Sequence, residues 1–146
     1  MTDSARFGHE RCLLCGAENP LSLRLRFESV GNCVKTRFKS SRYLQGYEGI
    51  LHGGVIAALL DAAMAHCLFH HDIRAVTAEL TVRFIHPVRC GCDLELRACI
   101  ESRRPPLFKL SSQLVCDGRT EASSEAKFLL LDTPSGVNSS CEDQVR

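Results

Sequence analysis

Between Val55 and Phe69 the chain reads VIAALLDAAMAHCLF, a run of strong helix formers without a glycine or a proline. Apolar residues recur on every side of such a helix, and only Asp61 and His66 interrupt them. A helix that is apolar all round is one that is buried all round. We therefore predict a central helix over 55–69 that other elements enclose.

The rest of the chain alternates between apolar and polar residues. Runs of this kind occupy 75–86, 92–101, 108–114 and 122–130, and turn signals such as Asp117-Gly118 separate them. Upstream, the same alternation at 21–27 and 34–38 flanks Gly31-Asn32, which predicts a hairpin. A period of two is typical of an antiparallel sheet with one buried face. The pattern predicts an α+β fold, a curved antiparallel sheet wrapped around one long central helix.

The bulk composition fits one domain and excludes several classes of partner. The chain has 146 residues, with 18 Lys and Arg against 17 Asp and Glu, so it lacks the basic footprint of a nucleic-acid or membrane-surface binder. Apolar runs stay shorter than the roughly 18 residues of a membrane span. The polar N-terminus does not resemble a secretory signal, which favours a cytoplasmic location. We expect a leader over 1–20, the domain over 21–132 and a flexible tail over 133–146.

The nine cysteines are expected to be reduced, because their number is odd and no secretory signal precedes them. Several of them lie in apolar runs, where a thiol behaves as a small buried hydrophobe. These are Cys67, Cys99 and Cys116.

Asp61 is the first candidate for chemistry, since a carboxylate in an apolar helix is costly unless it is paired, hydrogen-bonded or used. From this residue alone, a structural role and a catalytic one stay open. His52-Gly53-Gly54 precedes the helix. Glycines there leave backbone N–H groups accessible at a helix N-terminus, where they can stabilise an oxyanion. The other interpretation is a tight entry into the helix.

The spacing of these two motifs predicts a dimer if both are catalytic. Gly53 and Asp61 are eight residues apart, roughly 12 Å along a helix axis. An attacking water must lie within about 3–3.5 Å of the carbonyl carbon. One helix therefore cannot supply both groups, whereas two antiparallel copies related by a two-fold axis can. We expect a homodimer or a dimer of dimers.

The segment QGYEGILHGGVIAALLDAAMA, which begins at Gln45, resembles the signature of the phenylacetyl-CoA thioesterase-like (PaaI-like) branch of the hotdog-fold acyl-CoA thioesterases. The strand AVTAELTVRFIHPV is similar as well, and the resemblance covers about Cys12 to Asp132. It implies hydrolysis of an aromatic or medium-chain acyl-CoA. No cofactor is needed, because coenzyme A is part of the substrate.

The resemblance also implies roles for single residues. Asp61 would be the general base or the nucleophile, and the Gly53 amide would polarise the carbonyl. Thr77 would hold the attacking water or the carboxylate. The residues that would orient or surround the thioester are His52, Gln45, Gly46, Gly54 and Tyr47. Gly46 replaces an Asn of some relatives, so side-chain help there must come from Gln45.

Further features of the sequence allow more than one interpretation. Arg103 and Arg104 suit the phosphates of coenzyme A, although a solvated turn is the simpler interpretation. Cys12 and Cys15, with His9 nearby, make half a zinc site, and the sequence favours a tight turn there with no metal. His66 is expected to be a core or interface histidine with its hydrogen bonds satisfied. The alternative functions are a non-catalytic acyl-CoA sensor and a hotdog dehydratase or hydratase.

Overall fold

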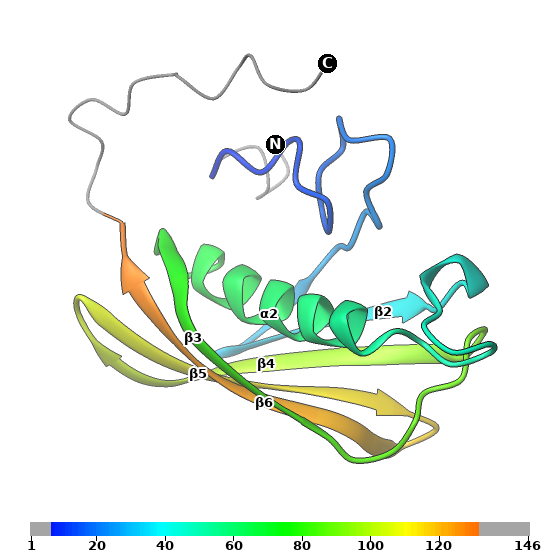
Figure 1. Ribbon diagram of the computed structural model, residues 1–146. Coiled ribbons are helices and arrows are strands. Elements are labelled where there is room, and N and C mark those ends of the chain that lie inside the picture. Colours follow the sequence, from blue (N-terminus) through cyan, green and yellow to red (C-terminus); the bar gives the residue numbers. More distant parts are fainter. Residues whose placement is uncertain (1–6, 132–146) are drawn as a thin grey trace.

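The computed structural model describes residues 7–131, in which one long helix lies against one face of a six-stranded antiparallel sheet (Figure 1). The helix is α2 (Gly53–Phe69), and a short 3-10 helix, η1 (Arg42–Leu44), precedes it. The strands are β1 (Glu28–Val30), β2 (Cys33–Lys39), β3 (Ala75–Phe84), β4 (Asp93–Arg104), β5 (Leu107–Cys116) and β6 (Arg119–Leu130). This confirms the predicted arrangement of a sheet curved around a central helix.

The order of the strands is β1-β2-β4-β5-β6-β3, so β3 and β1 form the two edges. The predicted turns at 31–32 and 117–118 join β1 to β2 and β5 to β6. Gly31 and Gly118 both adopt a positive φ there, a conformation that glycine reaches without strain. The tail predicted over 133–146 lies outside the described residues.

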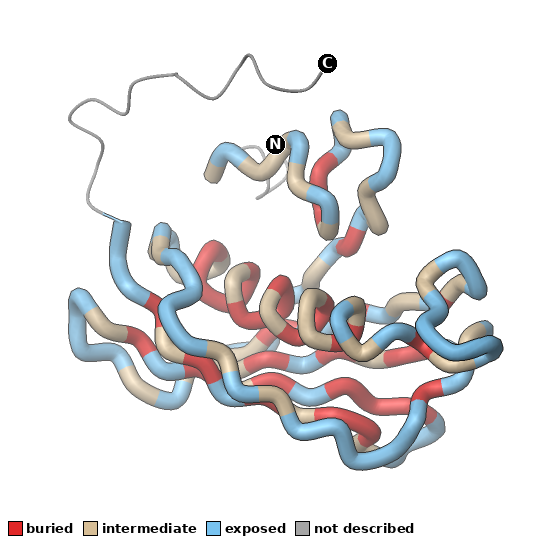
Figure 2. Tube along the Cα trace, in the orientation of Figure 1, coloured by how far each residue is buried: buried red, intermediate tan, exposed pale blue. Residues whose placement is uncertain are grey.

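The core lies between α2 and the inner face of the sheet (Figure 2). Leu59, Leu60 and Met64 are fully buried on the helix side. On the sheet side, the largest fully buried residues are Leu94, Leu96, Leu110, Leu114 and Phe128. The opposite face of α2 is not fully enclosed: Gly54 is exposed, while Ala57, Ala58, Asp61 and Ala65 are only half-buried. The prediction that the helix is buried on every side is therefore wrong for the face that these residues form.

The strand predicted over 21–27 is absent. Leu25 is buried and Leu23 and Phe27 pack against the core, as the alternation predicts, but the backbone does not join the sheet. Arg24 has a φ of 52°, which interrupts an extended chain. The amides of Leu23 and Leu25 instead donate to the carbonyls of Leu13 and Leu14, at 3.0 Å each. The backbone of this segment is thus bonded to the cysteine-containing turn, while β2 contacts it through the Thr36 hydroxyl, which donates to the Arg26 carbonyl.

A disulfide joins Cys33 to Cys99, so the prediction that all cysteines are reduced is wrong for this pair. The two residues are directly opposite each other on the neighbouring strands β2 and β4. Cys67 and Cys116 are buried thiols, as predicted. Residues 7–131 contain no helix with the length and apolar character that crossing a membrane requires.

Candidate active site

The loop before α2 is closed by its own hydrogen bonds. Gln45 pairs with Leu51 in an isolated bridge, and the Gly46 amide donates to the Ile50 carbonyl at 2.9 Å. The Gln45 side-chain oxygen accepts from the Gly49 amide at 3.0 Å, and Gly49 has a φ of 76°. Gln45 therefore holds the loop in shape through its oxygen. The side-chain amide nitrogen of Gln45 is the group that could donate a hydrogen bond to a ligand.

His52 is the N-cap of α2, where its ring Nδ1 accepts from the Gly54 amide at 2.8 Å. A Cβ on Gly54 would come within 3.0 Å of that Nδ1, so a larger residue at this position would crowd the cap. The Gly53 amide has no acceptor within residues 7–131. Of the two glycines, Gly53 is the one whose donor is available at the positive end of the helix dipole.

Asp61 lies on the partly open face of α2, where Thr77 of β3 reaches it. The Thr77 hydroxyl donates to Asp61 Oδ1 at 2.6 Å. Burial raises the pKa of the Asp61 carboxyl above its ordinary value, and the hydrogen bond from Thr77 offsets part of that rise. The second carboxylate oxygen is left to accept a proton. A half-buried carboxylate of this kind is suited to general-base or nucleophilic work.

A β-bulge makes the contact between Thr77 and Asp61 possible. The register of β3 against β6 shifts between Thr77, opposite Phe128, and Glu79, opposite Lys127. Regular alternation would place Thr77 on the same face as Glu79, away from the helix. The extra residue, Ala78, turns Thr77 to the inner face instead. Alternation alone gave no sign of this bulge.

The remaining predicted site residues do not meet Asp61 within one chain. Tyr47 is 85% exposed on the loop before the helix. Arg103 and Arg104 lie at the end of β4, on the exposed surface of the β4–β5 hairpin. Arg103 is close enough to His71 to lower its pKa, after the larger effect of burial, which places this arginine near the C-terminal end of α2. Gly53 is at the other end.

His66 is buried, but its Nε2 has no hydrogen-bond partner within the described residues, so the predicted satisfied histidine is wrong in that respect. Its ring stacks on Phe27, with centroids 4.5 Å apart. Burial lowers the pKa of His66 to about 4, so the ring is neutral at physiological pH. It packs as an aromatic residue does.

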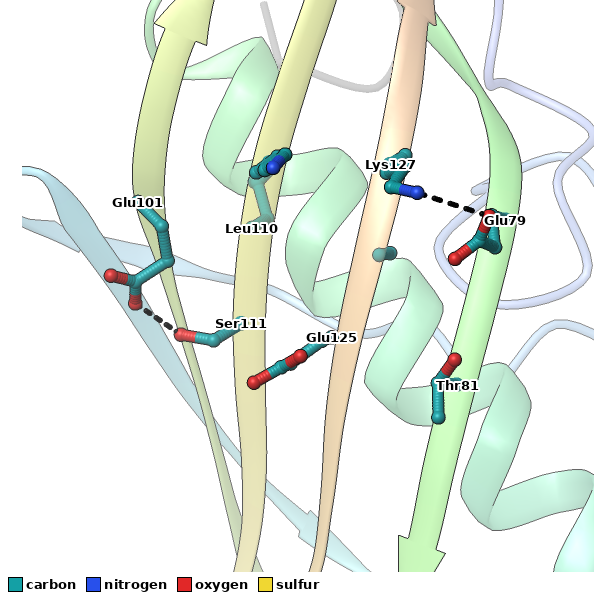
Figure 3. A pocket seen from close by; sticks show the side chains of 9 residues that line it. Glu79, Thr81, Glu101, Leu110, Ser111, Glu125 and Lys127 are labelled. Carbon is teal, nitrogen blue, oxygen red and sulfur yellow. Dashed lines mark hydrogen bonds and ion pairs between the residues drawn. The ribbon is translucent and has the colours of Figure 1, made fainter.

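A hollow of about 460 Å³ opens on the outer face of the sheet, away from α2 (Figure 3). Charged side chains line it, and two of them, Glu79 and Lys127, form an ion pair at 3.2 Å. Glu101 accepts a hydrogen bond from Ser111 on the other side of the hollow. No residue of the 45–61 segment contributes to this hollow. It is separate from the candidate active site.

The described residues contain one cluster of potential metal ligands, formed by His9, Cys12 and Cys15. It lies near the C-terminal end of α2, because His9 packs on Phe69. Cys90 and Cys92 do not belong to it.

A single long helix against a curved antiparallel sheet is the hotdog fold, and here the helix has a carboxylate in its middle and glycines at its start. A model of the Thioesterase superfamily matches residues 48–122, which include both motifs. The chain belongs to the Thioesterase superfamily.

Individual relatives agree with this assignment. The chain is 39% identical to the acyl-coenzyme A thioesterase THEM4 of Bos taurus over 51 residues, which are 35% of this chain and 20% of that protein. It superposes on the crystal structure of a thioesterase superfamily protein, RHA08564, with a TM-score of 0.75 and 25% identity, covering 80% of this chain and 61% of that one. The chain thus spans less than two thirds of the length of either relative.

The E. coli PaaI protein has the same fold, with a TM-score of 0.69 and 19% identity over 73% of this chain and 83% of that one. The fold expected from the resemblance to the PaaI-like branch is confirmed.

Proposed function

We propose that the protein hydrolyses acyl-CoA thioesters to a free acid and coenzyme A. The observation that carries this proposal is the half-buried Asp61 carboxylate, held by Thr77 in an otherwise apolar helix. Membership of the Thioesterase superfamily supports the reaction class, and the partial likeness to a bovine acyl-coenzyme A thioesterase supports coenzyme A as the thiol.

In the proposed reaction, Asp61 removes a proton from water as the water oxygen attacks the thioester carbonyl carbon. The carbonyl oxygen becomes an oxyanion, and the Gly53 amide donates a hydrogen bond to it. The C–S bond then breaks, and the coenzyme A thiolate takes up the proton that Asp61 had accepted. One water is consumed, and one acid and one thiol are formed. Direct attack by Asp61 on the carbonyl is the alternative course.

The proposed site is shared between two copies of the chain. Gly53 and Asp61 belong to one helix and lie roughly 12 Å apart along it, too far to act on one carbonyl. Two antiparallel helices centred near Ala57 would bring Gly53 of each copy to Asp61 of the other. The half-buried face of α2, with Ala57, Ala58 and Ala65, has the small side chains that allow a close approach.

The same arrangement would bring Arg103 and Arg104 close to the proposed site of the second copy. Arg103 lies near the C-terminal end of its own α2, and antiparallel packing would bring that end beside the loop that precedes α2 in the second copy. Arg103 and Arg104 would then approach Tyr47 and Gln45 across the interface. A guanidinium there would meet the phosphates of a coenzyme A whose thioester reaches Asp61.

The first test is a hydrolysis screen over acyl-CoA substrates with aromatic and medium-chain acyl groups. Phenylacetyl-CoA is included because the structurally similar PaaI comes from a phenylacetic acid degradation operon. Release of free thiol is the readout, and Asp61→Asn is expected to lower kcat by at least about 100-fold. Undiminished turnover in Asp61→Asn would remove this residue from the mechanism. Saturable binding without turnover of any substrate would favour an acyl-CoA sensor.

The folding of Asp61→Asn is expected to be intact. Because the pKa of Asp61 is raised in the folded chain, its stabilising contribution is present at low pH and lost as the pH rises through that pKa. Asparagine carries no charge to bury, so the variant should unfold at the same or a higher temperature than wild type at neutral pH. Thermal unfolding followed by circular dichroism checks this.

The second test addresses the shared site. A subunit with Asp61→Asn is mixed with a subunit in which Gly53→Pro removes the amide donor, after dissociation and reassociation. Mixed dimers contain one intact site, so activity should return to about one quarter of the wild-type value when assembly is random. Each variant mixed with itself is the control. No recovery in dimers shown to be mixed would contradict the shared-site arrangement.

A further inference from the structure

The turn from Cys12 to Cys15 brings three metal-ligating side chains together. His9 Nδ1 lies 3.6 Å from Cys15 Sγ, and the ligand atoms of His9, Cys12 and Cys15 are all within 4.8 Å of one another. In a tetrahedral zinc site with Zn–S of about 2.3 Å and Zn–N of about 2.0 Å, neighbouring ligand atoms are about 3.5–3.8 Å apart. The His9–Cys15 pair already has this spacing, and rotation of the side chains can supply the rest.

The backbone fixes the two sulfurs on one side of the turn. The Gly16 amide donates to the Cys12 carbonyl at 2.8 Å, and the Leu14 amide points at Cys12 Sγ at 3.3 Å. A Cβ on Gly16 would lie 2.4 Å from the Glu10 carbonyl oxygen and 2.5 Å from the Cys12 nitrogen, so only glycine fits. Hydrogen bonds from neighbouring groups orient the side chains that bind metals.

The third ligand is held from outside the turn. The His9 ring meets the Phe69 ring edge-on, with centroids 4.7 Å apart, and Phe7 stacks on the same ring at 4.7 Å. Cys15 is 1% exposed, whereas His9 and Cys12 are half-buried. The cluster thus lies at the edge of the core, where an ion can enter and where aromatic packing orients the imidazole.

We propose that His9, Cys12 and Cys15 bind a zinc ion, with a water as the fourth ligand. Two thiolates and an imidazole suit zinc, while magnesium and calcium prefer oxygen ligands. Binding releases one proton from each thiol to solvent, and His9 coordinates as the neutral imidazole.

The ion would have a structural role. It would join His9 to the 12–15 turn and so hold the His9 ring against Phe69 at the C-terminal end of α2. Phe69 is eight residues beyond Asp61, roughly 12 Å along the helix axis, so the ion would not reach the Asp61 carboxylate of its own chain. The proposal therefore stands independently of the thioesterase reaction.

The test uses the full-length chain under reducing conditions, titrated with Co²⁺ and then with Zn²⁺. We expect a thiolate-to-cobalt charge-transfer band that saturates at one ion per chain, and visible bands of tetrahedral cobalt that zinc abolishes. Zinc should also raise the temperature of unfolding, and a chelator should reverse that rise. The proposal is overturned if the wild-type chain gives no charge-transfer band. That result is expected if the segment is a turn that binds no metal, or if Cys12 and Cys15 form a disulfide.

The variants Cys12→Ser and His9→Gln decide which residues bind. Both positions are only half-buried, so the variants should fold even if Cys15→Ser does not. Each should lower the affinity for cobalt at least about tenfold. Cys90→Ser is the matched control, since Cys90 is an equally half-buried thiol outside the cluster, and it should bind as wild type does. Wild-type affinity in Cys12→Ser, or an equal loss in Cys90→Ser, would contradict the assignment.

Discussion

Two opposing effects set the acidity of Asp61. Burial raises its pKa, because a charged carboxylate is poorly solvated on the half-buried face of α2, and the Thr77 hydroxyl lowers it by donating to the ionised form. As a base or a nucleophile, Asp61 must be ionised. The rate of hydrolysis should therefore fall as the pH is lowered through the pKa of this group.

Replacing Thr77 by alanine tests this balance. Thr77→Ala removes the contribution that lowers the pKa of Asp61, so that pKa should rise further. The acid limb of the kcat/KM profile is then expected to move to higher pH, with a roughly tenfold loss at neutral pH. Thr77→Ser keeps the hydroxyl and is the control. A profile for Thr77→Ala with an unmoved acid limb would show that Asp61 does not govern it.

Thr77 also shows where prediction from sequence stops at the level of one residue. The resemblance to known thioesterases implied a role for it, but alternation along 75–86 placed it with Glu79 and Thr81 on the polar face. Only the bulge at Ala78 brings it to Asp61. A bulge depends on how two strands pair, which the sequence of one strand does not reveal.

Among the elements, α2 has a start that serves both its stability and the proposed chemistry. His52 satisfies the Gly54 amide and leaves the Gly53 amide available. Neither glycine has a positive φ, so backbone conformation does not require glycine at either position. The surroundings differ instead: a Cβ on Gly53 would make an ordinary contact with Phe84 at 3.5 Å, whereas one on Gly54 would crowd His52 at 3.0 Å.

The two glycines should therefore respond differently to alanine. Gly53→Ala is expected to raise the free energy of unfolding by about 0.5–1 kcal/mol, because alanine favours the helix. In Gly54→Ala this gain should be cancelled by the loss of the cap, which is worth about 1 kcal/mol. Urea unfolding of both variants measures the difference. Equal stabilisation of the two would mean that the His52 cap contributes nothing.

Periodicity predicted the elements well wherever a run was long and had a single period. The helix and the four long strands of the meander fall where the pattern placed them, within a few residues at each end. The strand predicted over 21–27 is wrong because the segment alternates but does not pair with another strand. Leu25 is buried, yet Arg24 turns the chain away from the sheet. The Cys33–Cys99 bond was missed because the odd number of cysteines indicated reduced thiols, and the pairing of β2 with β4, which sets the two residues opposite each other, joins positions 66 residues apart.

For the whole molecule, the two edges of the sheet are unequal. β1 is a strand of three residues, while β3 has ten. Exposed apolar side chains gather on and just after β3, with Val76 at 46%, Phe84 at 55% and Ile85 at 44% exposed. A long, apolar, unpaired edge is one that natural proteins cover, and the shared site proposed above needs a second copy beside Asp61 and Thr77. We expect β3 to be the edge at which two copies meet.

A pair of matched substitutions tests this edge. Val76→Lys places a charge on β3, and Val30→Lys places the same charge on β1, where Val30 is similarly exposed at 54%. A charge on an edge that pairs with its own copy disrupts the pairing, because the two-fold axis brings like charges together. Val76→Lys should therefore shift the mass measured by light scattering toward the monomer and lower hydrolysis in proportion. Val30→Lys should change neither. Two results would contradict the prediction: dissociation of the Val30→Lys variant, or a Val76→Lys variant with the mass and activity of wild type. Either result would place the contact between copies elsewhere, so Gly53 of one copy would no longer be expected to meet Asp61 of the other.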